Sequence, residues 1–366
     1  MSKKDKDIEN QNYMADKVNE KGSNTMRRSV LTGIDKIEII DAPKPVIVND
    51  NDVLIRMTVV GICGSDIHYY STGRIGSQVV KYPFTVGHEG AGVVEAVGPA
   101  VKSVKPGDRI AVEPSVACGH CNQCLAGRPH TCENNLFLGC PGQIEGNLAE
   151  YIVMPESQCI ILKGDLKPEH GATSEPLAIG CYAVKQAALS ATDSVAIIGF
   201  GPIGMSVLQM AKAQGIANIV VSEKIDERAK MAEKNGATKV VNPLNDSVPQ
   251  KVGNGFDVVF ECCGQQEAMD TAVDILKPGG KIMVIGIPEF DRWSFSADVA
   301  RRKELSLIHI RRQNGCTHQT LDMIEEGVVD GSAMITHRFQ FGQIAEAFDM
   351  VKNYRDGVMK AMVHFG

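Results

Sequence analysis

Hydrophobic residues alternate with polar residues in several short runs between about residues 27 and 115. The clearest of these runs read KIEII, DVLIRMTVV, GAGVVEAVG and DRIAVEP. Turn signals divide them, among them Pro-Gly-Asp at 106–108. Short strand-like runs bounded by turns are typical of β-sheet, so this part of the chain predicts an all-β, barrel-like unit rather than βα repeats.

The pattern changes at Asp193. An apolar strand, SVAIIGF, precedes a segment with apolar residues at helical spacing, GPIGMSVLQMAKAQG. A second strand and helix follow at IANIVVSE and DERAKMAEKNG, and further strands at ATKVVNP, FDVVFECCG and KIMVIGI. Alternating βα units predict a parallel sheet covered on both faces. The last segment, about 318–366, returns to mixed helix and strand.

Composition excludes some function classes. The formal net charge of -6 argues against a nucleic-acid or anionic-membrane partner. No apolar run reaches the roughly 18 residues that a membrane-spanning helix needs. Residues 1–26 lack the apolar core of a secretory signal, so we interpret them as a disordered extension; a leftover leader or a start at Met26 fits equally well. The 11 cysteines show no disulfide-like framework, which favours a reducing cytoplasm.

A glycine motif, Gly199-Phe-Gly201-Pro-Ile-Gly204, lies between a predicted strand and a predicted helix. The first glycine allows a tight turn, the second lets a pyrophosphate approach the backbone, and the third lets helix and strand pack closely. The N-terminus of the helix attracts phosphates. The motif predicts a dinucleotide site, although a structural turn without a ligand has the same pattern.

The next predicted strand ends at Glu223, where an acid would bond the ribose hydroxyls and repel a 2′-phosphate. This residue favours NAD over NADP. Arg228 and Lys224 keep some use of NADP open, and a solvated charge at a helix start explains Lys224 equally well.

A cysteine-rich loop has the spacing C-x2-C-x2-C-x7-C. Its four cysteines are Cys118, Cys121, Cys124 and Cys132. Four thiolates can close a tetrahedron around Zn²⁺, and metal binding would fold a loop with so little apolar content. An iron–sulfur cluster is the alternative, but its usual spacings differ. We expect His120 at the surface, because the cysteines already fill the site.

Three separated pieces of the chain could form a second metal site. They contain Cys63, the pair His88-Glu89, and Glu175. A thiolate, an imidazole and a carboxylate can hold Zn²⁺ while leaving a position for water or substrate. Spacing alone does not join these pieces, because Cys63 could be a small buried hydrophobic residue and His88 a satisfied polar residue.

The motifs taken together are similar to those of a known family. Gly-His88-Glu89-Gly-x-Gly-x-Val, the four-cysteine loop and G-x-G-P-x-G resemble the zinc-containing medium-chain alcohol dehydrogenases, from about residue 27 to the C-terminus. His68-Tyr-Tyr, the stretch 73–81 and Thr-His-Arg-Phe at 336–339 resemble its polyol branch, which includes sorbitol, L-iditol and xylitol dehydrogenases.

This resemblance implies a GroES-like β-barrel catalytic domain with an inserted Rossmann domain, a doubly wound parallel sheet. We expect the catalytic domain at 27–180, with the structural zinc loop at 114–147. The Rossmann domain is expected at 181–317, and the chain would return to the catalytic domain at 318–366. The active site would lie in the cleft between the two domains.

The resemblance also implies roles for single residues. Cys63 and His88 would bind a catalytic zinc directly, with Glu89 as a further ligand and Glu175 bound directly or through water; which of the two glutamates touches the metal is left open. The residues expected to contact NAD are Gly199, Gly201, Pro202, Ile203, Gly204, Glu223, Arg228, Ile285, Arg311 and Lys360. Lys360 is expected near the pyrophosphate, and a solvated lysine is the alternative.

The implied activity is zinc-dependent hydride transfer between NAD and a secondary alcohol of a polyol or sugar derivative. The proton would leave through Ser65, the nicotinamide ribose and His68. Asp66 would orient His88, or serve only as a turn residue. Alternative activities are those of an L-threonine 3-dehydrogenase, a 2,3-butanediol dehydrogenase, or a sugar-acid or sugar-phosphate dehydrogenase. A non-catalytic, crystallin-like NAD-binding protein would be expected to lack some of these residues. The family further implies a homotetramer or homodimer.

One feature departs from the family. Arg311 matches the family arginine at the rim of the cleft, whereas Arg312 stands where sorbitol enzymes carry a tyrosine. A second guanidinium suits an acidic or phosphorylated sugar, because it pairs bidentately with such anions. Contact with cofactor phosphates or with another subunit explains Arg312 equally well.

Overall fold

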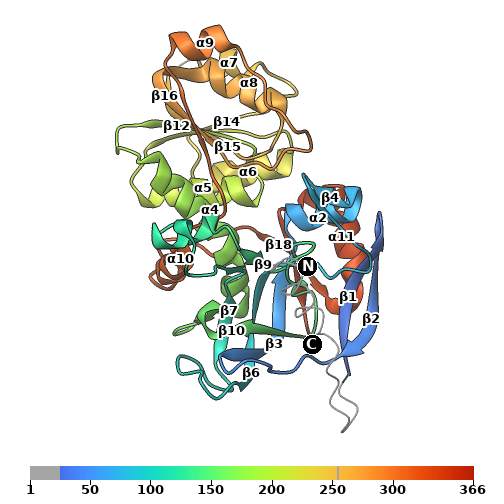
Figure 1. The fold of residues 1–366 in the computed structure, drawn as a ribbon. Coiled ribbons are helices and arrows are strands. Elements are labelled where there is room, and N and C mark those ends of the chain that lie inside the picture. Colours follow the sequence, from blue (N-terminus) through green and yellow to red (C-terminus); the bar gives the residue numbers. More distant parts are fainter. Residues whose placement is uncertain (1–24, 254) are drawn as a thin grey trace, which may run out of the picture.

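The structure is a computed structural model that describes residues 25–253 and 255–366 (Figure 1). Most of the expected extension, residues 1–24, lies outside the described residues. Thr25 and Met26 do not belong to an extension, because they begin strand β1 (Thr25–Gly33) and Met26 is buried. Strand β1 pairs with β2 (Lys36–Pro43) in an antiparallel ribbon.

The lower domain in Figure 1 is built on a seven-stranded sheet. Its strands follow the order β11 (Cys159–Ile161), β7 (Arg109–Val112), β6 (Glu89–Val97), β3 (Asp52–Gly61), β19 (Lys360–His364) and β18 (Ile335–Gln340), and β10 (Tyr151–Pro155) also pairs with β3. All pairs are antiparallel except β18 with β19. The strands expected from the alternating runs are therefore confirmed, and the segment expected to return to this domain supplies β18 and β19.

Short elements complete this domain. The additional strand pairs are β4 (Arg74–Ile75) with β5 (Gln78–Val79), and β8 (Ser115–Val116) with β9 (Leu136–Phe137). The helices are α2 (Gly64–Thr72), α3 (Asn122–Leu125), α10 (Cys316–Glu325) and α11 (Ile344–Lys352). Helix α2 corrects the expectation of an all-β unit before residue 115. It forms because Asp66 in its first turn accepts a hydrogen bond from the backbone of Cys63, the residue that caps the helix.

The upper domain has a six-stranded parallel sheet, as the βα pattern predicts. Its strands follow the order β14 (Lys239–Val241), β13 (Asn218–Ser222), β12 (Ser194–Ile198), β15 (Phe256–Glu261), β16 (Leu276–Val284) and β17 (Ser306–His309). Its helices are α5 (Pro202–Ala213), α6 (Asp226–Lys234), α7 (Val248–Val252), α8 (Gln266–Ile275) and α9 (Ala297–Arg302). Alternate residues of β12 face opposite sides: Val195 and Ile197 pack with α5, and Ala196 and Ile198 pack with α8.

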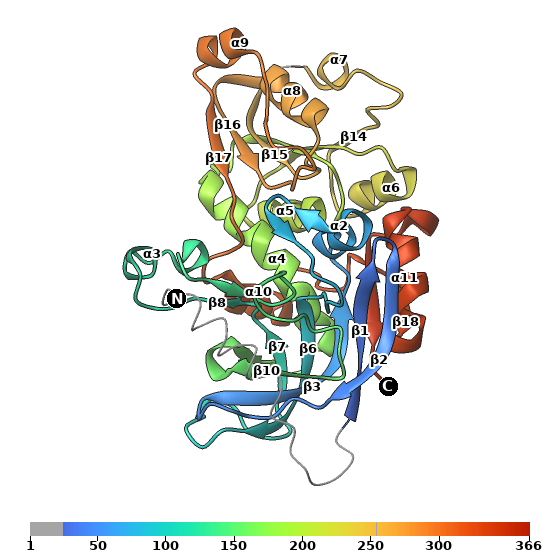
Figure 2. The ribbon, with the colours of Figure 1, turned by 45° about the vertical axis from the view of Figure 1, so that its right-hand side comes forward.

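Helix α4 (Pro168–Ala187) connects the two domains, as both ribbon views show (Figures 1 and 2). It packs against β6 and β7 on one side and against α5 on the other. The sequence did not indicate this helix. The domain boundary expected between residues 180 and 181 falls inside it, because one apolar cluster spans α4 and parts of both domains. No helix among the described residues is long and apolar enough to cross a membrane.

Candidate active site and metal centres

Strand register brings together the first two pieces of the expected metal site. β3 and β6 are antiparallel neighbours, and Gly61 at the end of β3 pairs with Glu89 at the start of β6. Position 61 has no room for a side chain, because a Cβ there would lie 2.5 Å from Glu89 Oε2. The chain then continues to Cys63, which has an extended backbone at the N-terminus of α2.

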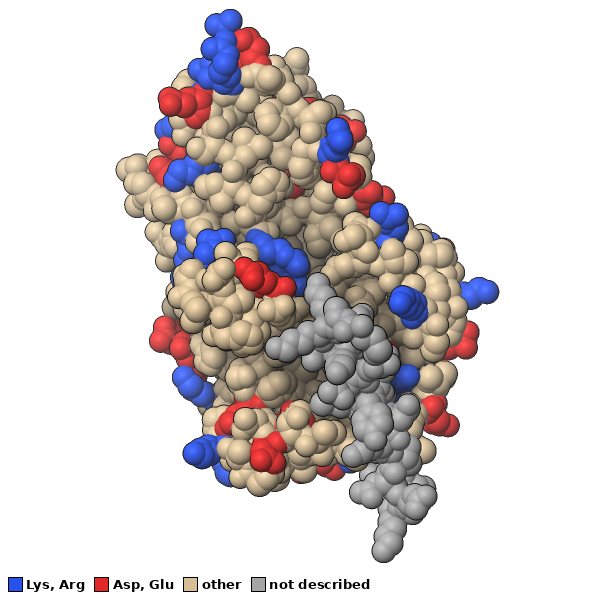
Figure 3. Space-filling model, in the orientation of Figure 1, with Lys and Arg blue, Asp and Glu red and all other residues tan. Residues whose placement is uncertain are grey.

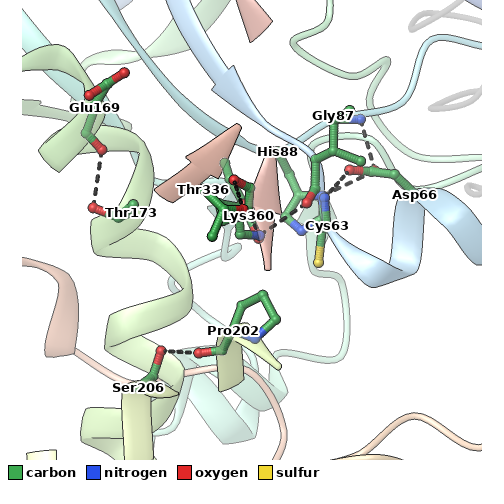
Figure 4. A network of polar contacts seen from close by, with 12 residues as sticks. Cys63, Asp66, Gly87, His88, Glu169, Thr173, Pro202, Ser206, Thr336 and Lys360 are labelled. Carbon is green, nitrogen blue, oxygen red and sulfur yellow. Dashed lines mark hydrogen bonds and ion pairs between the residues drawn. The ribbon is translucent and has the colours of Figure 1, made fainter. Parts of the chain in front are cut away.

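Asp66 fixes these segments relative to each other. Its buried carboxylate accepts hydrogen bonds from the backbone N–H groups of Cys63 and Gly87, both at 3.0 Å (Figure 4). Its Oδ1 lies 3.6 Å from Nδ1 of His88, which leaves the Nε2 atom of that ring for another partner. The turn role of Asp66 is therefore observed, and its role in orienting His88 stays a prediction that this proximity supports.

Cys63, His88 and Glu89 form a cluster of possible metal ligands. Each offers one ligand atom, and these atoms all lie within 4.8 Å of one another. Burial opposes a positive charge on His88, but Asp66 and Cys63 outweigh burial and raise the pKa of its ring well above the ordinary value. The site thus favours positive charge. Its thiolate, imidazole and carboxylate donors fit a zinc ion that keeps one position open.

Lys360 on β19 belongs to this cluster rather than to the expected cofactor site. Its Nζ donates to both carboxylate oxygens of Glu89, at 2.7 and 2.6 Å, and to the carbonyl oxygen of Ile62 at 3.0 Å. Both charged side chains are only 1% exposed. The expectation that Lys360 approaches the pyrophosphate is therefore wrong in this structure, because its three N–H donors are already used around Glu89.

Glu175 comes from α4 and lies outside the three-residue cluster. Burial raises the pKa of its carboxyl to about 7; the charge of His88 opposes this shift, and the charges of Glu89 and Glu113 add to it. Glu175 is therefore close enough to the cluster to respond to its charges. Its expected role as a metal ligand, direct or through water, stays a prediction.

The four-cysteine loop has the geometry of a closed zinc site. Among Cys118, Cys121, Cys124 and Cys132, three sulfur–sulfur distances are 3.5, 3.7 and 4.0 Å. A disulfide would need about 2.05 Å, whereas a tetrahedron with zinc–sulfur bonds of about 2.3 Å has edges of about 3.8 Å. The ring of His120 bonds the carbonyl oxygen of Cys118 at 2.7 Å and is not in the cluster, as expected.

The glycine motif forms the turn between β12 and α5. Gly199 has φ +90°, in the left-handed region that favours glycine. A Cβ on Gly204 would lie 2.2 Å from the carbonyl oxygen of Gly199, so only glycine lets the helix start this close to the strand. Gly201 caps α5, and Pro202 is its first residue. The expected strand–turn–helix context of the motif is confirmed.

Comparison with known proteins supports the resemblance. Residues 49–164 match the alcohol dehydrogenase GroES-like domain, and residues 202–326 match the zinc-binding dehydrogenase family. A sorbitol dehydrogenase of Bacillus subtilis is 33% identical over 93% of this chain and 97% of its own length. This chain is a zinc-binding dehydrogenase of the medium-chain type.

Two further relatives extend this comparison. An L-idonate 5-dehydrogenase of Vitis vinifera is 34% identical over 81% of this chain and 84% of its own length. A solved alcohol dehydrogenase from Escherichia coli CFT073, complexed with NADH, superimposes with a TM-score of 0.85 at 27% identity, over 94% of this chain and all of that one. The GroES-like plus Rossmann architecture of the dehydrogenase is thus confirmed.

Glu223 lies beside the glycine turn of the dehydrogenase. Its buried carboxylate accepts hydrogen bonds from the backbone N–H groups of Phe200 at 2.6 Å and Ile225 at 2.8 Å. Arg228 donates to the carbonyl oxygen of Val358, two residues before Lys360. Arg228 thereby links the Rossmann domain to the strand that holds the metal cluster. The contacts of Glu223 and Arg228 with NAD stay predictions, as do those of Pro202 and Ile203.

The two residues of the expected proton relay lie on α2. Ser65 is half-buried next to Asp66, and His68 lies one turn further along the helix. Nδ1 of His68 is 3.6 Å from a carboxylate oxygen of Glu289, which comes from the Rossmann domain. Burial lowers the pKa of His68, and Glu289 opposes that shift. The helix therefore faces the other domain across the cleft, as a relay to the cofactor would require.

Sequence reasoning missed Glu261, a fully buried acid at the end of β15. Its carboxylate accepts hydrogen bonds from the backbone N–H groups of Cys263 and Gly264, at 2.9 and 2.6 Å. Its carbonyl oxygen accepts one from Ile285, a residue expected to contact NAD, at 2.9 Å. The acid at the end of the apolar run VVFE, directly before Cys262 and Cys263, was the signal that could have indicated it.

Arg311 and Arg312 follow β17, where the chain re-enters the catalytic domain. Figure 3 shows basic side chains at the edge of a hollow between the two domains. Both arginines line a pocket of about 360 Å³ with residues of the cysteine-rich loop. Sequence reasoning missed Phe137 in that loop, which is a neighbour of both Arg312 and His88. Its ring centroid is 4.0 Å from the guanidinium carbon and 5.4 Å from the imidazole centroid.

Proposed function

We propose that this dehydrogenase transfers a hydride between NAD and a secondary alcohol of a polyol or sugar-derived substrate. The observation that carries the proposal is the cluster of Cys63, His88 and Glu89, held beside a Rossmann domain in a chain 33% identical to a sorbitol dehydrogenase. The relatives named for sorbitol and L-idonate favour such substrates over threonine or 2,3-butanediol. A bound zinc would act there as a Lewis acid that makes the substrate hydroxyl more acidic.

Residues of the chain would position the metal ligands, carry the proton and place the cofactor. Asp66 would keep the His88 ring oriented, and Lys360 holds the Glu89 carboxylate in place through an ion pair. Ser65 and His68 would carry the proton from the substrate hydroxyl toward solvent, since a half-buried histidine whose pKa is lowered is neutral and ready to accept a proton. The Rossmann turn at 199–204 would position the nicotinamide for the hydride.

NAD rather than NADP is proposed because Glu223 places a carboxylate next to the glycine turn. A homotetramer or homodimer and a location in the cytoplasm are further predictions, which the measured native mass and cell fractionation would test.

The test is a screen of NAD reduction over polyols, aldonates and sugar phosphates, with zinc content measured on the same preparations. Cys63→Ser should lose one of two zinc ions per chain and at least about a thousandfold in kcat/KM, since it removes a ligand of the reacting centre. Cys159→Ser changes a buried cysteine outside both clusters and is the matched control. Full activity of the Cys63 variant, or of zinc-free enzyme that is still folded, would contradict the proposal.

Ser65→Ala tests the relay separately. With zinc retained, kcat should fall and the pH profile should change, because the proton loses its first acceptor. Unchanged turnover across the pH range would remove Ser65 from the relay without affecting the role of the metal cluster.

A further inference from the structure

The pocket beside the candidate active site carries two adjacent positive charges without an ion-pair partner. Arg311 is exposed and Arg312 is half-buried. In the part of the chain that the structure describes, no carboxylate forms an ion pair with either guanidinium. Glu133 also lines the pocket, and Glu113 and Glu175 are near enough to influence Arg312 or to respond to its charge, but none neutralises the pair directly.

The backbone holds Arg312 in an unusual conformation. Its φ is +55°, in a region that residues other than glycine rarely adopt and that costs of order 1 kcal/mol or more. Such strain persists only where the surroundings enforce it, and it is concentrated at functional sites. Here it coincides with the stacking of the guanidinium on Phe137, the ring that also contacts His88.

The position of Arg312 carries an electrostatic cost. Burial, with the neighbouring charge of Arg311, lowers the pKa of Arg312 to about 10. A partly desolvated cation without a paired anion is unfavourable, so the site is more stable when an anion is present. A planar guanidinium forms parallel hydrogen bonds with the two oxygens of a carboxylate or phosphate, which a point charge cannot do.

The rest of the pocket offers further polar contacts. Nδ1 of His130 is buried without a hydrogen-bond partner, while Nε2 of the same ring pairs with the hydroxyl of Tyr182 at 2.9 Å. Oε1 of Gln143, on the pocket wall, is also buried without a partner, but it is an acceptor and would not bond an anion. Thr131 and Asn135 line the same wall. Nδ1 of His130, in a residue that is only 5% exposed, is an unused donor when Nε2 accepts from Tyr182, and it favours a ligand over bulk solvent.

We propose that this pocket binds an oxyanion carried by the substrate, a carboxylate or a phosphate ester on the part of the sugar chain away from the oxidised carbon. The proposal rests on the proposed function, because it places the oxidised carbon at the cluster of Cys63, His88 and Glu89. One aromatic ring, Phe137, contacts both His88 of that cluster and the guanidinium of Arg312. The preferred substrate is therefore a sugar acid or sugar phosphate, and a neutral polyol is used less well.

The experiment compares a neutral hexitol, the corresponding aldonate and the corresponding terminal phosphate ester as substrates of the holoenzyme. Wild type should have the highest kcat/KM for one of the two anions. Arg312→Gln should lower kcat/KM for that anion by about 10- to 100-fold, mainly through KM, because hydrogen bonds to charged groups contribute that much. For the neutral hexitol, kcat/KM should change by less than about threefold. For the anion, kcat/KM of Arg312→Lys should lie between the values of wild type and Arg312→Gln, since lysine keeps the charge but not the planar pair of N–H donors.

Arg301→Gln is the matched control. Arg301 lies on α9 in the Rossmann domain, where it pairs with Asp298. Its substitution removes the same charge at a position away from the pocket. Calorimetric titration with inorganic phosphate gives a readout that does not depend on turnover. Wild type and the Arg301 variant should bind phosphate, and Arg312→Gln should bind it at least about tenfold more weakly.

Three results would overturn the inference. Equal kcat/KM for the neutral hexitol and both anions would show that the pocket does not bind a substrate anion. Phosphate bound equally well by Arg312→Gln and wild type would show that the guanidinium does not hold the anion. An Arg312→Gln variant with a raised KM for NAD and an unchanged KM for the anion would assign the arginine to the cofactor. Absence of NAD reduction with every compound would instead contradict the proposed function itself.

Discussion

Replacement of Lys360 by methionine should destabilise the catalytic domain more than any surface charge change. The substitution keeps an unbranched side chain but removes the ammonium that donates to Glu89 at 2.7 and 2.6 Å and to Ile62 at 3.0 Å. Glu89 then becomes a buried carboxylate without its ion-pair partner, since both side chains are 1% exposed. Breaking a buried ion pair from one side costs about 3–5 kcal/mol.

Differential scanning calorimetry of metal-free protein measures this effect. A cost of about 3–5 kcal/mol corresponds to a fall in Tm of roughly 5–15 °C for a domain of this size. Lys163→Met is the control, because Lys163 is 63% exposed in its ion pair with Asp322, and a surface pair of this kind contributes little. We expect a much smaller change in Tm for the control.

Zinc should reduce the difference between the Lys360 variant and wild type. A divalent cation held by Cys63, His88 and Glu89 replaces part of the lost countercharge, so zinc should raise the Tm of Lys360→Met more than that of wild type. The double variant Lys360→Met, Glu89→Gln should recover much of the metal-free stability. If Lys360→Met lowered Tm no more than Lys163→Met, the claim that Glu89 depends on this lysine would be refuted.

Three further outcomes can be checked independently. Glu289→Gln should move the low-pH limb of kcat/KM for alcohol oxidation to lower pH, because Glu289 raises the pKa of His68; the shift should be small, since Glu289 is 65% exposed. A shift to higher pH would contradict the contact. Gly204→Ala should weaken NAD binding at least about tenfold in a fluorescence titration, because its Cβ would meet the carbonyl oxygen of Gly199 at 2.2 Å; unchanged affinity would mean that the turn relaxes freely. Cys132→Ser should cost one zinc per chain and make the loop at 114–147 sensitive to protease, whereas wild-type resistance would show that the loop folds without its metal.

The sequence predicted the elements of the fold better than their connection. Alternating runs and βα units indicated the strands of both sheets, because each has a local hydrophobic pattern. Helix α4 was missed because it contains Gly171, Pro176 and Gly180, which disfavour a helix locally. The structure explains the glycines: a Cβ at Gly171 would lie 2.9 Å from the Cβ of Ala91, and one at Gly180 would lie 2.6 Å from that of Ser206. Close packing against both domains requires glycine at these two positions. The contacts come from residues far away in the sequence, so the local pattern cannot indicate them.

The candidate site shows the same division. The four cysteines of the loop are close in sequence, so their spacing alone predicted a metal site. Cys63 and Glu89 are joined only by the pairing of Gly61 with Glu89 across two strands, which only the resemblance to a family could anticipate. Lys360 was assigned to the wrong partner, because its own sequence neighbourhood shows nothing of β3 or β6.

The position of Lys360 shows how the catalytic domain depends on the chain segment that follows the Rossmann domain. The chain leaves the catalytic domain through α4 and returns to place β19 beside β3, where Met362 pairs with Gly61. That return supplies the countercharge of Glu89, so the ligand cluster is complete only after the C-terminal strand has joined the sheet. Arg228 of the Rossmann domain bonds the carbonyl oxygen of Val358 just before this strand. The strand that stabilises the metal cluster is thereby in direct contact with the domain expected to hold the cofactor, which gives cofactor binding and the metal site a shared structural element.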